Sequence, residues 1–121
     1  MMVKYDIYTY DITTDSLFIA FPVEYEYAEV IPLDDDFLME IDVGGHPRAI
    51  EILNASTHFG VDKESLPEIR KLHMKITVTD ETIVVEIILT LLNKDMIPLI
   101  EQVKNINKFP CNNENIAVSL S

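Results

Sequence analysis

The sequence predicts an α+β fold: a β-rich, antiparallel meander sheet with one amphipathic helix over about 95–107 and a short helical turn over about 66–72. Short segments in which apolar and polar residues alternate with period two recur along the chain, which is typical of strands with one solvated face. One later segment instead has apolar residues at helical spacing, Leu99, Val103 and Ile106. The length of 121 residues corresponds to a single domain over 1–121.

About four or five strands are expected in the first half of the chain. Pro22, the acidic run 34–36 and the pair Gly44-Gly45 separate them, because proline ends a strand and tight hairpin turns need residues that adopt a positive φ. Together these strands predict an acidic β-meander over 1–57. The expected strands cover residues 17–21, 23–27, 37–43 and 49–53.

The second half, 58–121, is expected to form an apolar β/α extension that packs on the meander. A capping-box pattern from Ser65 to Glu68 opens the helical turn, and further strands are expected over 74–78 and 116–120. The segment 83–92 is apolar on both faces, so it is either a central strand or a strand buried between subunits. The residues expected in the core or in a homodimer seam are Val84, Ile87, Ile88 and Leu92.

The charge of the chain is strongly acidic and unevenly distributed. It has 21 acidic and 9 basic residues, a net charge of -12. Residues 1–60 hold 12 acids and 2 bases and carry -10, whereas residues 61–121 hold 9 acids and 7 bases and carry -2. Because phosphate recognition needs clustered lysine and arginine, this charge excludes a nucleic-acid partner.

The acidic half favours a basic protein as partner, because complementary charge steers the encounter of two proteins. The acids that alternate with apolar residues along the expected strands are the candidates to face that partner: Glu24, Glu26, Glu40 and Asp42.

The sequence gives no sign of a membrane segment or of export. The longest apolar run, 83–92, is too short to span a bilayer, and the N-terminus lacks the apolar stretch of a signal peptide. Cys111 is the only cysteine, so no intramolecular disulfide can form. These features predict a cytoplasmic protein.

Residues that would carry chemistry are scarce, and we expect no catalytic residue and no cofactor. The 3 histidines lack the spacing of metal ligands, and 3 glycines are too few for a phosphate-binding loop. Only Asp34, Asp35 and Asp36 offer enough neighbouring oxygens for a divalent metal. A solvated turn explains the same run of residues.

The first half of the chain resembles a family known as domain of unknown function 2283, over residues about 5–56. The resemblance rests on the following segments: Tyr10-Asp11, Asp15 to Ile19, Leu33 to Asp36, Ile41-Asp42 and Ala49 to Ser56. It implies a compact, β-rich meander of prokaryotic origin with no established activity. Some members of the family are encoded beside small basic toxin-like proteins, which implies an antitoxin-like role. Ala49 stands where the family usually has glycine, and His46-Pro47 lengthens or stiffens the hairpin.

Taken together, the sequence predicts a small acidic protein that acts as a non-enzymatic protein-protein interaction module toward a basic partner. Two alternatives stay open. One is a divalent-cation-binding protein that uses Asp34 to Asp36. The other is a small-molecule binder or an enzyme of unknown reaction, for which the sequence names no residue.

Overall fold

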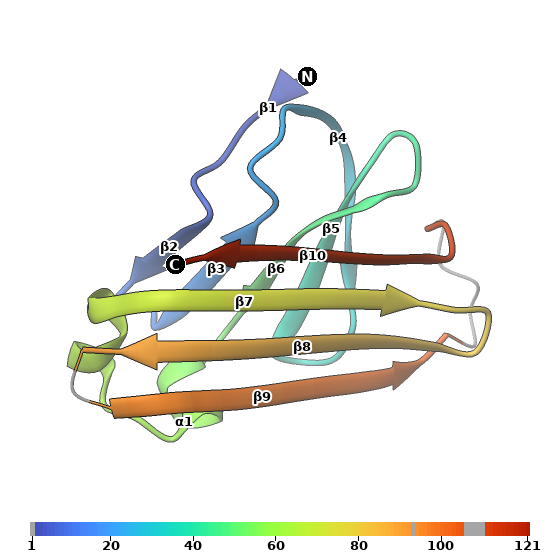
Figure 1. Ribbon diagram of the computed structural model, residues 1–121. Coiled ribbons are helices and arrows are strands. Elements are labelled where there is room, and N and C mark those ends of the chain that lie inside the picture. Colours follow the sequence, from blue (N-terminus) through green and yellow to red (C-terminus); the bar gives the residue numbers. More distant parts are fainter. Residues whose placement is uncertain (1, 93, 106–110) are drawn as a thin grey trace.

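The computed structural model describes residues 2–92, 94–105 and 111–121. Within them, two antiparallel sheets pack face to face, and the strands of one sheet run across those of the other (Figure 1). Two short helical segments connect the sheets, so the prediction of a β-rich, antiparallel α+β fold is confirmed.

The first sheet has the strand order β1-β4-β5-β6-β3-β2, and the second has the order β10-β7-β8-β9. The strands of the first sheet are β1 (Met2–Val3), β2 (Tyr8–Asp11), β3 (Ser16–Ala20), β4 (Tyr25–Pro32), β5 (Phe37–Asp42) and β6 (Pro47–Ile52). The helical segments are α1 (Ala55–Phe59) and the 3₁₀ turn η1 (Lys63–Glu68). The strands of the second sheet are β7 (Ile69–Val78), β8 (Thr82–Leu91), β9 (Lys94–Lys104) and β10 (Glu114–Leu120).

The first sheet is a meander only from β4 to β6. The strand β6 then pairs on its other side with the earlier strand β3, with Leu17 opposite Ile52 and Ile19 opposite Ile50. This is the Greek-key order, in which the first of four strands lies beside the last. In this register the buried residues of β3 lie opposite the buried residues of β6. The apolar face of β3 therefore continues the buried face of the sheet.

The predicted amphipathic helix over 95–107 is wrong. The chain instead forms the edge strand β9, which pairs antiparallel with β8. The last two residues of the predicted helix, 106–107, lie outside the described residues.

The helical spacing of Leu99 and Val103 is ambiguous, because residues four apart share a face in a strand as well as in a helix. In β9 both side chains are half-buried toward the first sheet, together with Ile97. The β-branched residues of the segment favour a strand, and Pro98 is tolerated because β9 lies at a sheet edge.

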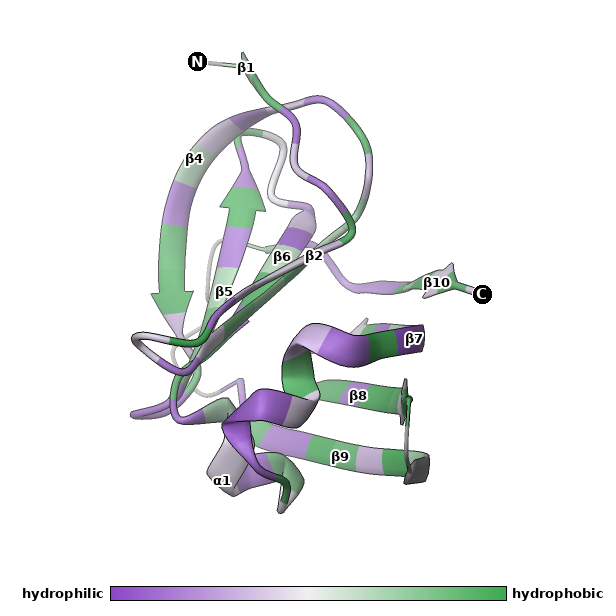
Figure 2. Ribbon diagram, turned by 90° about the vertical axis from the view of Figure 1, so that its left-hand side faces the viewer, coloured by the Kyte–Doolittle hydropathy of each residue, from purple (hydrophilic) through white to green (hydrophobic). Residues whose placement is uncertain are grey.

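The connection between the sheets also differs from the prediction. The 3₁₀ turn η1 ends at Glu68, and β7 already begins at Ile69, so the helical turn expected over 66–72 is shorter and lies earlier. The segment 55–59 forms the unpredicted helix α1, which Gly60 ends at a φ of 66°. Helix α1 lies beside β9 (Figure 2).

One hydrophobic core lies between the two sheets. Alternate side chains of β3, β5, β6, β7 and β8 point into it, and Ile87 is only 1% exposed there. The first sheet contributes Leu17, Ile19, Phe37, Met39, Ile50 and Ile52, and the second contributes Leu72, Met74, Ile76, Ile83, Val85, Ile87 and Leu89. Among the described residues, the second sheet therefore covers one face of the first and not the opposite, outer face.

Candidate functional site

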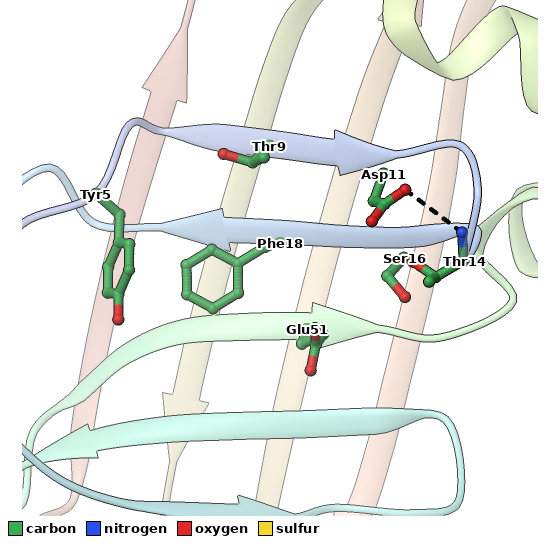
Figure 3. A pocket seen from close by; sticks show the side chains of 7 residues that line it. All are labelled: Tyr5, Thr9, Asp11, Thr14, Ser16, Phe18 and Glu51. Carbon is green, nitrogen blue, oxygen red and sulfur yellow. Dashed lines mark hydrogen bonds between the residues drawn. The ribbon is translucent and has the colours of Figure 1, made fainter.

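An open groove of about 480 Å³ lies on the outer face of the first sheet. Its walls come from β2, β3, β6 and the segments on either side of β2 (Figure 3). Thr9, Phe18 and Glu51 pair in register and form one row across the three strands. The lining residues are Tyr5, Thr9, Asp11, Thr14, Ser16, Phe18 and Glu51.

Two aromatic rings form the apolar part of the groove. The ring centroids of Tyr5 and Phe18 lie 4.9 Å apart with the planes at 67°, an edge-to-face contact. Behind Tyr5, the ring of Tyr25 follows at 6.2 Å. Burial, assisted by the charge of Glu40, raises the pKa of Tyr5, so its hydroxyl stays protonated.

Two carboxylates supply the charge of the groove. One oxygen of Asp11 accepts the backbone N–H groups of Thr13 at 2.9 Å and Thr14 at 3.4 Å. Glu51 is half-buried, and its carboxylate makes no hydrogen bond or ion pair with any residue that the structure describes. The lining holds no lysine, arginine or histidine, so the groove attracts cations.

A small depression of about 30 Å³ continues the groove past Phe18 and Glu51 toward Glu40. Glu40 is only 7% exposed, and the Tyr25 hydroxyl donates to its Oε1 at 2.5 Å. Burial, followed by this hydrogen bond and the charge of Glu40, raises the pKa of Tyr25. Glu40 is therefore held in place by the hydroxyl of Tyr25.

The four predicted partner-facing acids occupy different environments. Glu24 and Glu26 are exposed, whereas Glu40 and Asp42 are buried. Asp42 Oδ2 accepts a hydrogen bond from Arg48 Nε at 2.8 Å, and its Oδ1 accepts the backbone N–H groups of two residues of the following turn. Burial opposes ionisation, but these bonds and the Arg48 charge outweigh it and lower the pKa of Asp42. The buried pair supports the sheet instead of facing solvent.

The acidic run 34–36 forms the turn between β4 and β5. Asp34 Oδ1 accepts the backbone N–H groups of Asp36 at 2.9 Å and of Phe37 at 3.0 Å, whereas Asp35 is exposed. Asp36 Oδ2 lies 2.8 Å from Nε2 of His58 in α1. In the described part of the chain, no three His, Cys, Asp or Glu side chains converge as ligands for a metal.

Asp34 also meets Glu101 of β9, and the two side chains share a hydrogen bond. Burial, followed by this bond and the charge of Asp34, raises the pKa of Glu101 to about 7, although His58 opposes the shift. A carboxyl pair of this kind needs a proton between its members to be stable. It therefore joins the β4–β5 turn to the second sheet in a pH-dependent way.

A buried polar cluster is centred on Asp15, the last residue of the β2–β3 turn, and joins the half-buried Tyr10 to the buried Ser56. The Tyr10 hydroxyl donates to Asp15 Oδ1 at 2.6 Å, and Ser56 donates its hydroxyl to Oδ2 at 2.6 Å and its backbone N–H to Oδ1 at 3.1 Å. Burial opposes ionisation of Asp15, but the bonds from Ser56 and Tyr10 outweigh it and lower its pKa. All three residues belong to the segments that carry the family resemblance, so the cluster accounts for part of that motif structurally.

The residues expected in a core or dimer seam divide between the two faces of β8. Ile87 points into the core, whereas Val84 is half-buried on the outer face of the second sheet. Ile88 and Leu92 are 37% and 49% exposed. Next to β8 on the edge strand, Ile100 is 64% exposed, so the outer face of this sheet carries apolar side chains.

None of the helices in the described residues is long and apolar enough to cross a membrane.

Comparison with known proteins gives a single result, a match to one family model. No curated protein and no solved structure matches the chain. Residues 7–56 match the family described as "Protein of unknown function (DUF2283)", which confirms the predicted resemblance over less than half of the chain. This matched segment contains the buried polar cluster and every residue of the groove except Tyr5.

Proposed function

We propose that the protein is a non-enzymatic interaction module that binds a basic protein through the outer face of its first sheet, in the manner of an antitoxin. The observation that carries the proposal is the groove on that face. Carboxylates and aromatic rings line it, and no basic side chain does. Aromatic rings supply contact area at an interface, and the carboxylates select a positively charged partner.

The distribution of charge along the chain supports the first sheet as the side that attracts a basic partner. Residues 1–60, which form the first sheet, carry -10. A field of this sign raises the local concentration of a basic partner and speeds its association. The second sheet, with a charge of only -2 over residues 61–121, contributes little to this field.

The chemistry of the lining suits binding better than catalysis. Apart from its two carboxylates, the groove offers four hydroxyls and two rings, and none of its lining residues is a histidine, lysine or cysteine. Histidine is the most frequent general base in enzymes, and a serine or threonine hydroxyl needs an adjacent base of this kind to act as a nucleophile. Binding of a cationic group requires no such base.

The proposal is tested by affinity capture with matched baits. The wild-type chain, Glu51→Lys and the control Glu24→Lys are immobilised, and proteins retained from the source cells are identified by mass spectrometry. The control makes the same charge reversal at an exposed residue outside the groove. Circular dichroism confirms that each bait is folded.

We expect a basic protein that the wild type and Glu24→Lys retain and Glu51→Lys does not. Its dissociation constant should rise with salt, since exposed charges are screened. An acidic partner, a salt-independent one, or one that Glu51→Lys retains equally contradicts the proposal.

A further inference from the structure

We infer that the groove on the first sheet receives the guanidinium group of an arginine side chain of the basic partner. The inference rests on the proposed function and names the chemical group that the site recognises. It depends on three features of the groove: an aromatic wall, a carboxylate that lacks a partner, and hydroxyls around the rim.

The aromatic wall offers a π-face to a cation. In the edge-to-face contact of Tyr5 with Phe18, one ring presents its edge, so the rings do not cover each other as in a parallel stack. Both rings line the groove, and Phe18 is half-buried. A cation over such a ring is attracted by its quadrupole, and arginine makes this contact more often than lysine.

The carboxylate of Glu51 lies beside that wall. Glu51 is the direct cross-strand neighbour of Phe18, and side chains in such a pair have Cβ atoms about 4.5–5.5 Å apart. A half-buried carboxylate without a hydrogen-bond partner is unfavourable, because it has lost part of its hydration and gained nothing in return. A guanidinium over Phe18 would reach it and donate two parallel N–H bonds.

The rest of the groove favours arginine over lysine. Guanidinium has five N–H donors in a planar fork and is weakly hydrated, so it can stack on a ring while it donates to several acceptors. Thr9, Thr14 and Ser16 line the rim and offer hydroxyl oxygens as further acceptors. A lysine ammonium is a strongly hydrated point charge and would use the aromatic wall less well. The volume of about 480 Å³ leaves room for the side chain and the adjoining peptide.

The test is a titration of the full ¹⁵N-labelled chain with small probes, in which binding is measured from the NMR chemical shifts of the backbone amides. The probes are Nα-acetyl-arginine methylamide, the lysine equivalent, and the citrulline equivalent, which keeps the shape of arginine without its charge. We expect saturable shifts at Thr9, Phe18 and Glu51 with arginine, binding weaker by about fivefold or more with lysine, and no shifts with citrulline.

Variants separate this site from a general acidic surface. Glu51→Gln should weaken arginine binding about tenfold, which corresponds to one charge-assisted contact. The control Glu24→Gln, which removes the same charge outside the groove, should leave binding within about twofold. Phe18→Leu keeps the apolar volume but removes the ring, and it should also weaken binding. Thermal unfolding monitors the fold of each variant.

Equal affinity for arginine and lysine, shifts scattered over the acidic surface, or unchanged affinity in Glu51→Gln each overturn the inference. The experiments distinguish failure of this inference from failure of the proposed function. If affinity capture yields a basic partner that depends on Glu51 while the arginine probe does not bind, only the guanidinium assignment is wrong. If arginine binds in the groove and no basic partner is found, the binding site stands and the proposed function fails.

Discussion

The carboxyl pair of Glu101 and Asp34 makes the stability of the fold depend on pH near neutrality. Glu101 lies on β9, half-buried, and the charged groups that act on it are Asp34 of the β4–β5 turn and His58 of α1, which itself pairs with Asp36. Burial and the hydrogen bond and charge of Asp34 raise the pKa of Glu101 from 4.5 to about 7. We therefore predict the effect of Glu101→Gln, which removes the titration and keeps a hydrogen-bond donor.

The direction of the effect follows from the number of bound protons. Between pH 4.5 and about 7, the folded protein retains a proton on Glu101 that the unfolded chain has released. The free energy of unfolding therefore falls as the pH rises through this window. Below pH 4.5 both states are protonated and the contribution is fully present; above about 7 it is lost.

The magnitude follows from the same two values. At about 1.36 kcal/mol for each pH unit, the difference between 4.5 and about 7 corresponds to at most about 3.4 kcal/mol. Glu101 is only half-buried, and screening by water reduces the expected effect to about 1–2 kcal/mol. Glu101→Gln should thus be more stable than wild type by about this amount at pH 8 and similar to it near pH 5.

The assay is urea unfolding of both proteins, followed by circular dichroism, at several pH values between 5 and 8. Subtracting one curve from the other cancels the pH dependence of the remaining acids. Glu86→Gln is a suitable control, because Glu86 lies on the neighbouring strand in an exposed pair with Lys75. A difference between wild type and Glu101→Gln that stays constant over this range, or that grows toward low pH, refutes the reasoning.

Three further predictions concern stability and assembly. Ser56→Ala removes a hydrogen-bond donor from the buried polar cluster and should lower the free energy of unfolding in urea by about 1–2 kcal/mol. The control Thr57→Ala, at an exposed position of the same helix, should lower it by less than about 0.5 kcal/mol. Equal losses contradict a role for the cluster. Ile87→Ala should cost about 2–5 kcal/mol and Ile88→Ala less than half as much, because only the first faces the core; the reverse order contradicts the assignment of faces. A homodimer seam on the outer face of the second sheet predicts that Ile100→Lys converts dimers to monomers in sedimentation velocity, and a wild-type chain that sediments only as a monomer rules out this seam.

Strands with one buried face were predictable from the sequence. The alternation of Leu17 with Phe18, or of Ile76 with Thr77, reflects directly which side chains face the core. The edge strand β9 was missed because its inward residues are half-buried and their spacing fits a helix equally well. The short strands β1 and β2 have too few residues for a periodic pattern.

The groove was not predictable, because it depends on which strands are neighbours. Phe18 and Glu51 are 33 positions apart in the sequence, and only the pairing of β3 with β6 places them side by side. The positions of Glu40 and Asp42 follow from the same kind of contact. Their alternation with apolar residues fits solvated acids, but Tyr25 and Arg48 cover them from other strands. Sequence patterns report the face of a strand and not what packs on that face.

The arrangement of the sheets determines which face of the segment 7–56, which matches the family model, stays accessible. Without a cover, the segment 7–56 would expose its inner face, with Leu17, Ile19, Ile50 and Ile52, to water. An apolar face of this size must be buried for the sheet to be stable. In this chain β7 to β10 provide the cover, so that face cannot serve recognition. The groove with the carboxylates of Asp11 and Glu51 lies on the opposite, outer face, and the proposed recognition site is therefore on the face that the second sheet leaves uncovered in the described residues.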